Sequence, residues 1–165
     1  MPVHGGSLRL YWQRDKFKAQ ISVKAKDLLN QEKKLDLTSP RRYNRFAHRV
    51  QRLKQQLTSK LQQLKQKNKS IMGYGAAAKG NVLLNFCQLG PDIIDSIVDS
   101  IPFKQGLYTP GTKIPIYPEK KLLQDMPDYT LLLAWNFAEE IIIKQNLYQE
   151  KGGKFIIAIP QLQII

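Results

Sequence analysis

A chain of 165 residues is long enough to bury one hydrophobic core and to carry a helical extension beside it. Its only cysteine, Cys87, leaves neither a disulfide framework nor a cysteine metal cluster. The sequence has no apolar run of membrane-spanning length and no signal-peptide pattern, so we expect a cytoplasmic protein.

The formal net charge of +13 is distributed unevenly along the chain. Residues 1–69 carry 18 Lys or Arg and 4 Asp or Glu, a net charge of +14, whereas residues 70–165 carry 8 and 9, a net charge of −1. Nucleic-acid binding would therefore belong to the leading segment alone, and we expect no nucleic-acid partner. We predict a single domain in which residues 1–69 form a leading strand and helical brace and residues 70–165 form an α/β core.

The leading segment begins with a turn, MPVHGGS, that is followed by a predicted strand at Leu8–Trp12. His4 in this turn is a candidate substrate-binding residue, base or ligand, and the alternative is a solvated loop histidine. Apolar residues spaced by three and four predict a helix over 21–34 and a longer one that starts at Ser39 and Pro40 and runs to about Lys67.

The long predicted helix has one apolar stripe and a basic opposite face. The stripe consists of Tyr43, Phe46, Ala47, Val50, Leu53, Leu57, Leu61 and Leu64. We predict that it braces the α/β core and leaves part of the stripe for a partner. The basic face has three interpretations: a solvated surface, an anion-binding surface near a nucleotide, or an electrostatic patch for a partner or nucleic acid.

Residues 70–87, SIMGYGAAAKGNVLLNFC, read as the end of a buried strand, a glycine turn and an amphipathic helix. Such a turn directs backbone N–H groups and the positive end of the helix dipole at one point, which suits a phosphate. We therefore predict that Gly73 and Gly75 permit a close approach to the ligand and that Lys79 and Gly80 lie near its phosphates. The alternative is that the glycines only form a tight turn and that Ala78 lets the helix pack closely.

A second predicted strand ends at Asp99, where an acidic residue suits a ribose hydroxyl. The alternative is that Asp99 caps the turn before Pro102. The long loop that follows offers Lys104, Gln105 and Thr112 as donors for a phosphate or sugar pocket. The alternative here is a plain turn with a solvated Lys104.

The remaining pattern predicts a short strand at 114–117, a helix at 119–126, a strand at 129–135, a helix at 137–148 and a last strand at 154–160. The fold class is therefore α/β: a Rossmann-like, mostly parallel sheet flanked by helices and preceded by a strand and a long basic helix. Trp135 and Asn136 end a strand at the edge where ligands bind in such sheets. Trp135 could stack on a base or sugar or simply be core, and Asn136 stands where it would cap the next helix.

Several blocks of the sequence resemble one known family. In chain order these are HGGSLRLYW, the helix with Tyr43 and Phe46, GYGAAAKGNVLLN, VDSIPFKQGLYTPGTKIPI, PDYTLLLAWNFAEEI and GGKFIIAIP. They are similar to the C-terminal domain of bacterial S-adenosylmethionine-dependent sugar C-methyltransferases over nearly the whole chain. The resemblance implies a Rossmann-like domain that helps to hold a nucleotide-linked deoxyketosugar, of dTDP type, beside a methyl-donor domain.

In that family the complete enzyme also has a zinc-binding module and a central domain that binds S-adenosylmethionine. This chain shows no cysteine cluster and no methyl-donor motif, so we expect it to bind neither cofactor alone and to transfer no methyl group as an isolated chain. The partner would be a methyl-donor domain in cis or in trans. Two alternatives remain: a stand-alone dinucleotide-binding subunit and a basic interaction module.

Overall fold

The computed structural model describes residues 7–14 and 20–165. The chain consists of two compact units, residues 1–51 and 52–165. The prediction of one domain with a boundary near residue 69 stays a prediction. No helix in these described ranges is long and apolar enough to cross a membrane.

The first unit contains helix α1 (Val23–Lys34) and the beginning of α2 (Pro40–Gln66), both of which the spacing of apolar residues predicted. Ser22 caps α1 by accepting a hydrogen bond from the N–H of Ala25. The predicted strand at Leu8–Trp12 is wrong, since residues 7–14 form neither helix nor strand. An isolated strand has no neighbour for its backbone hydrogen bonds or its apolar face, and Trp12 is 90% exposed. His4 lies outside the described residues.

Helix α2 uses only the last part of its apolar stripe to build the core. Its buried residues are Leu57, Leu61 and Leu64, all in the second unit. Tyr43 and Phe46, near its start, are more than half exposed. Within the second unit, the end of the helix therefore packs on the hydrophobic core, and the brace formed by residues 1–69 stays a prediction.

The second unit is built on a six-stranded sheet in the order β3-β2-β1-β4-β5-β6. The strands are β1 (Ile71–Tyr74), β2 (Ser96–Asp99), β3 (Ile116–Pro118), β4 (Tyr129–Leu132), β5 (Lys154–Ile157) and β6 (Gln163–Ile164). The first five are parallel, and β6 pairs antiparallel with β5. The strand order reverses between β1 and β4, so the predicted α/β class and mostly parallel sheet are confirmed. The two-residue β6 was not predicted.

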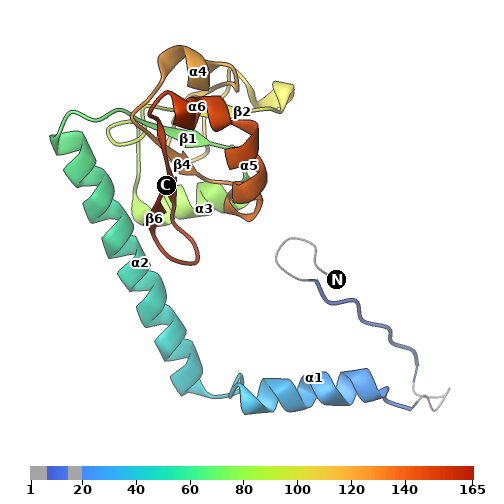
Figure 1. The fold of residues 1–165 in the computed structure, drawn as a ribbon. Helices are drawn as coiled ribbons and strands as arrows, with labels where there is room; N and C mark the ends of the chain where they lie inside the picture. Colours follow the sequence, from blue (N-terminus) through green and yellow to red (C-terminus); the bar gives the residue numbers. More distant parts are fainter. Residues whose placement is uncertain (1–6, 15–19) are drawn as a thin grey trace. The chain divides into compact units, whose positions relative to one another are not determined.

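Helices cover both faces of this sheet (Figure 1). They are α3 (Ala78–Cys87), α4 (Lys121–Asp125), α5 (Ala138–Lys144) and α6 (Asn146–Glu150), with short 3-10 turns η2 (Pro102–Lys104) and η3 (Trp135–Phe137). Side chains alternate along each strand: Ile71 packs with α3 and the end of α2, and Met72 packs with α4, α5 and α6.

The helix predicted at 137–148 is in fact two helices, α5 and α6, which meet at Gln145. Gln145 is 93% buried and directs its amide into the unit, where it bonds to two other side chains. Asn136 does not cap this helix as predicted, because it lies within η3 and the residue at the N-cap of α5 is Phe137.

Candidate functional site

The glycine turn lies at the carboxyl end of β1, next to the point where the strand order reverses. Gly75 has a φ of +90°, and its N–H donates to the carbonyl of Val98 at 2.8 Å. A Cβ at this position would lie 2.9 Å from the Cβ of Ala134 on the neighbouring segment. The turn therefore requires glycine both for its backbone conformation and for its close approach to the segment after β4.

The other two glycines of the motif are packed against side chains. A Cβ at Gly73 would lie 2.8 Å from Cγ1 of Ile97, and one at Gly80 would lie 2.6 Å from the Cβ of Leu133. Gly80 thus allows the close helix–sheet contact that the sequence pattern assigned to Ala78, which is exposed. A role for Gly73 and Gly80 in ligand binding stays a prediction.

Asp99 ends β2 and is 96% buried. One carboxylate oxygen accepts from the backbone N–H of Ala76 at 2.7 Å, and the other accepts from that of Ile101 at 2.8 Å. Asp99 therefore joins the glycine turn to the loop after β2. Its bond to Ile101 is the turn cap before Pro102 that the sequence offered as the alternative role. The predicted contact with a ribose hydroxyl stays untested.

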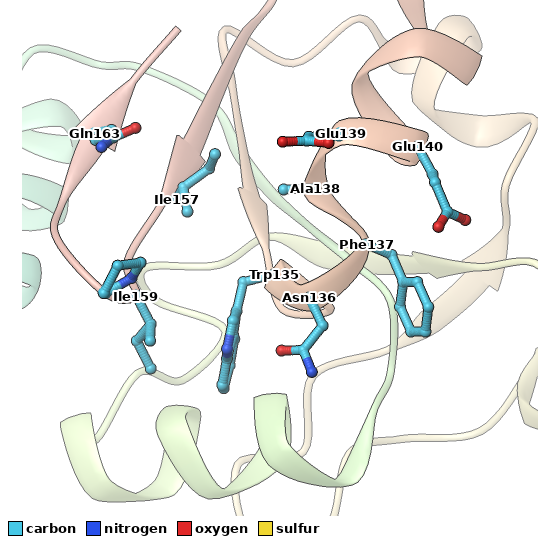
Figure 2. A pocket seen from close by; sticks show the side chains of 10 residues that line it. Trp135, Asn136, Phe137, Ala138, Glu139, Glu140, Ile157, Ile159 and Gln163 are labelled. Carbon is cyan, nitrogen blue, oxygen red and sulfur yellow. The ribbon is translucent and has the colours of Figure 1, made fainter. Parts of the chain in front are cut away.

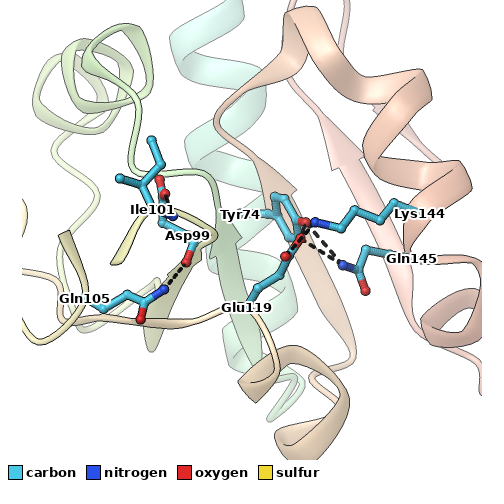
Figure 3. A network of polar contacts seen from close by, with 7 residues as sticks. All are labelled: Tyr74, Asp99, Ile101, Gln105, Glu119, Lys144 and Gln145. Atoms are coloured by element: carbon cyan, nitrogen blue, oxygen red, sulfur yellow. Dashed lines mark hydrogen bonds and ion pairs between the residues drawn. The ribbon is translucent and has the colours of Figure 1, made fainter. Parts of the chain in front are cut away.

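Lys104 and Gln105 hold the same loop against the turn. The ammonium of Lys104 donates to the carbonyl of Ala76 at 3.0 Å and lies 3.3 Å from Oδ2 of Asp99. The amide of Gln105 donates to the carbonyl of Asp99 at 2.9 Å (Figure 3). Lys104 is thus not a solvated loop lysine, since its ammonium bonds to the glycine turn.

Thr112 lies further along the loop, in its own set of bonds. Its hydroxyl is 2.7 Å from that of Thr109, which accepts from the N–H of Ile114 at 2.8 Å. These bonds fix the fold of the loop. A contact between Thr112 and ligand stays a prediction.

Lys79, Trp135 and Asn136 lie together at the carboxyl edge. The ammonium of Lys79, in the first turn of α3, is 5.3 Å from the ring centre of Trp135 and 5.6 Å from that of Phe137. Trp135 and Asn136 follow β4 in η3 and line a cavity (Figure 2). Lys79, Trp135 and Asn136 therefore lie near one another at the edge where the sequence placed them, and their role in ligand binding stays a prediction.

Three cavities follow one another along this edge. The loop cavity, of about 550 Å³, lies between the glycine turn, α3 and the loop after β2, and includes Ala77, Val82, Lys104 and Tyr108. The central cavity, of about 350 Å³, includes Gly75, Ala77, Asp99, Lys104, Glu119, Phe137, Glu140 and Lys144. The aromatic cavity, of about 390 Å³, includes Trp135, Asn136, Phe137, Glu139, Glu140 and Gln163 (Figure 2).

Neighbouring cavities share lining residues. Ala77 and Lys104 belong to both the loop and central cavities, and Phe137 and Glu140 belong to both the central and aromatic cavities. The three cavities are therefore neighbours in a row past the point where the strand order reverses.

The charges of the cavities differ. Lys104 is the one ionisable group besides Tyr108 among the residues that line the loop cavity, whose walls are mainly apolar. The central cavity combines two lysines with three carboxylates, and the aromatic cavity has two carboxylates. The loop cavity thus suits a flat ring beside an anion, and the central cavity suits a ligand that both donates and accepts hydrogen bonds.

A network of polar side chains at the central cavity was not predicted. Glu119 accepts from the hydroxyl of Tyr74, from the amide of Gln145 at 3.0 Å and from the ammonium of Lys144 at 2.6 Å (Figure 3). The four residues come from β1, the segment before α4, and α5 with the residue after it. The sequence offers one signal for them, a polar Gln145 in a helical pattern of mostly apolar inward positions.

In the described part of the chain, no three His, Cys, Asp or Glu side chains are grouped so that they could hold a metal ion. Cys87 is buried, and burial raises the pKa of its thiol. These residues therefore do not fit a zinc site.

Comparison with known proteins gives two matches. The family described as the C-methyltransferase C-terminal domain matches residues 2–160. The C-methyltransferase NovU of Streptomyces niveus is 35% identical over 163 residues, which are 99% of this chain and 39% of that protein. The chain thus spans about two fifths of the length of this relative.

Proposed function

Because this chain belongs to the family of C-methyltransferase C-terminal domains, we propose that it binds the nucleotide-linked sugar of an S-adenosylmethionine-dependent C-methyltransferase. In this proposal the complete enzyme methylates a carbon of a nucleotide-linked deoxyketosugar, and a methyl-donor domain acts in cis or in trans. The observation that carries the proposal is the row of cavities at the carboxyl edge of the sheet, where α/β domains bind nucleotides.

The loop cavity is the best place for the nucleoside. Ala76–Ala78 and Val82 form one apolar side, and Leu107 and Tyr108 contribute from the loop after β2. Tyr108 is 66% exposed, so its ring is accessible to a flat base. The loop is anchored through Lys104 and Gln105, so this cavity is held open by bonds within the protein.

The phosphates would then lie beside the glycine turn. The first N–H groups of α3 have no acceptor within the helix, and the positive end of its dipole favours an anion. Lys104 adds an ammonium group at the carbonyl of Ala76 in the turn, and Lys79, in the first turn of α3, adds a second one over the ring of Trp135. These residues bind and orient the ligand, and the methyl group would be supplied by S-adenosylmethionine on the donor domain.

Calorimetric titration of the full chain with dTDP and dTDP-glucose tests the proposal. We expect both to bind, and we expect Tyr108→Ala to weaken both by about tenfold, because one stacking contact contributes about 1–3 kcal/mol. Phe103→Ala is the matched control, since it removes an exposed ring from the same loop outside the residues that line the cavity. A folded chain that binds neither compound would contradict the proposal.

A further inference from the structure

Lys144 is held at the central cavity by Glu119, which is in turn bonded to two buried polar side chains. Its ammonium bonds to Oε2 of Glu119 at 2.6 Å, and the side chain of Lys144 is 57% exposed. The other oxygen of Glu119 accepts from Gln145 and from the hydroxyl of Tyr74, both of which are more than 90% buried. The bonds from Tyr74 and Gln145 therefore hold Glu119 in place, and Glu119 in turn holds the ammonium of Lys144 at the cavity wall.

The central cavity carries charges of both signs. Asp99 is paired with Lys104, and Glu119 is paired with Lys144, while Glu140 adds a carboxylate from α5. A diphosphate placed entirely within this cavity, and not at its border beside the glycine turn, would face three carboxylates, so its charge would be repelled. A hydroxylated ring is favoured instead, because its oxygens accept from ammonium groups and its hydroxyls donate to carboxylates.

The position of the cavity agrees with this chemistry. The central cavity shares Ala77 and Lys104 with the loop cavity, so a ligand whose phosphates lie at the glycine turn would extend from one cavity into the next. Phe137 adds an apolar ring to the lining of this cavity, suited to the carbon face of a sugar.

We propose that the central cavity holds the sugar ring of the nucleotide sugar, with Lys144 donating to an oxygen of the ring and Glu140 accepting from a hydroxyl. Glu119 is a positioning residue that acts through Lys144. The inference rests on the proposed function, since it needs the nucleotide to lie in the loop cavity.

The test compares the affinities of the full chain for dTDP and for dTDP-glucose by calorimetry. Lys144→Ala should weaken binding of dTDP-glucose by about tenfold, because a hydrogen bond to a charged group contributes about 1.5–3 kcal/mol, and it should leave binding of dTDP unchanged. Lys144→Arg, which keeps a donor, should restore part of the loss. Lys151→Ala is the matched control, an exposed lysine at the end of α6 that lines none of the three cavities.

The positioning role of Glu119 is tested by a double-mutant cycle. Glu119→Gln should weaken binding of dTDP-glucose in the native background and have no further effect on it in the Lys144→Ala background. A purely structural role would instead weaken dTDP and dTDP-glucose alike in both backgrounds.

The outcomes separate the two proposals. If the native chain binds dTDP but Lys144→Ala weakens both compounds equally or neither, the sugar assignment is wrong and the proposed function stands. If the folded native chain binds neither compound, the proposed function is wrong and the sugar assignment falls with it.

Discussion

The carboxylate of Asp99 accepts a hydrogen bond from the backbone N–H of Ala76 at 2.7 Å, and this bond joins the end of β2 to the glycine turn after β1. The same oxygen is 3.3 Å from the ammonium of Lys104, which in turn bonds to the carbonyl of Ala76. The turn is therefore bound through both its N–H and its carbonyl. Its shape is set before any ligand arrives, which lowers the entropy cost of binding.

Asp99→Asn should destabilise the second unit by about 3 kcal/mol, because it breaks a buried ion pair and turns an amide donor toward other donors. Urea unfolding monitored by circular dichroism measures the change. Asp125→Asn is the control, since it removes a carboxylate from an exposed pair with Lys121 and should cost about 0.5 kcal/mol or less. Equal losses in the two variants would show that Asp99 does not hold the turn.

The sequence predicted most of the fold because its elements have local signals. The stripe of α2 and the continuous apolar run of β4 each define an element by spacing alone. The segment Leu8–Trp12 has the composition of a strand but no neighbouring strand, and composition does not supply one. The position of the candidate site residues at one edge of the sheet could be predicted from topology, since the carboxyl ends of parallel strands meet there.

The central cavity could not be predicted in this way. Glu119 and Lys144 are 25 positions apart in the sequence, and Tyr74 reaches them from β1. The residue pattern within one helix or strand does not predict a contact that joins three separate segments of the chain. The pattern also joined α5 and α6 into one helix, because the inward turn of Gln145 depends on its distant partners Tyr74 and Glu119.

Gly80→Ala tests the close contact between α3 and the sheet. The added Cβ would lie 2.6 Å from the Cβ of Leu133 and 3.0 Å from its carbonyl oxygen, so the helix must move. Overpacking costs about 1–3 kcal/mol, which outweighs the gain of up to about 1 kcal/mol from replacing a helical glycine. We expect a net loss of about 1 kcal/mol in urea unfolding.

Val82→Ala is the control for this experiment, because Val82 lies on the exposed side of the same helix. It should change the free energy of unfolding by about 0.5 kcal/mol or less. A Gly80→Ala variant as stable as the native chain would mean that the helix packs less closely than the structure shows.

Tyr148 gives the second unit a dependence on alkaline pH. Burial raises the pKa of its phenol to about 12, and the hydroxyl donates to the carbonyl of Pro127 at 2.8 Å. Because the folded pKa is above the ordinary value of 10.0, the stability that it contributes is complete below pH 10 and is lost as the pH rises toward 12. Tyr148→Phe should cost about 1 kcal/mol at neutral pH and make stability less sensitive to pH above 10. Urea unfolding across this pH range measures both effects, and an unchanged alkaline dependence in the variant would contradict the assignment.

Asp128 gives the opposite dependence, at acidic pH. A hydrogen bond from Lys69 and one from the backbone N–H of Ser70 lower its pKa to about 2 from an ordinary 3.8. A depressed pKa means that the carboxylate stabilises the folded state fully above about pH 5, and that this contribution disappears as the pH falls through 3.8 to about 2. The difference in unfolding free energy between the native chain and Asp128→Asn should therefore be constant near neutrality and shrink in acid. Urea unfolding at several pH values measures it, with Asp92→Asn as a control that removes an exposed carboxylate from the same unit. A difference between the native chain and Asp128→Asn that stays constant down to about pH 2 would show that these bonds do not depend on the charge of Asp128.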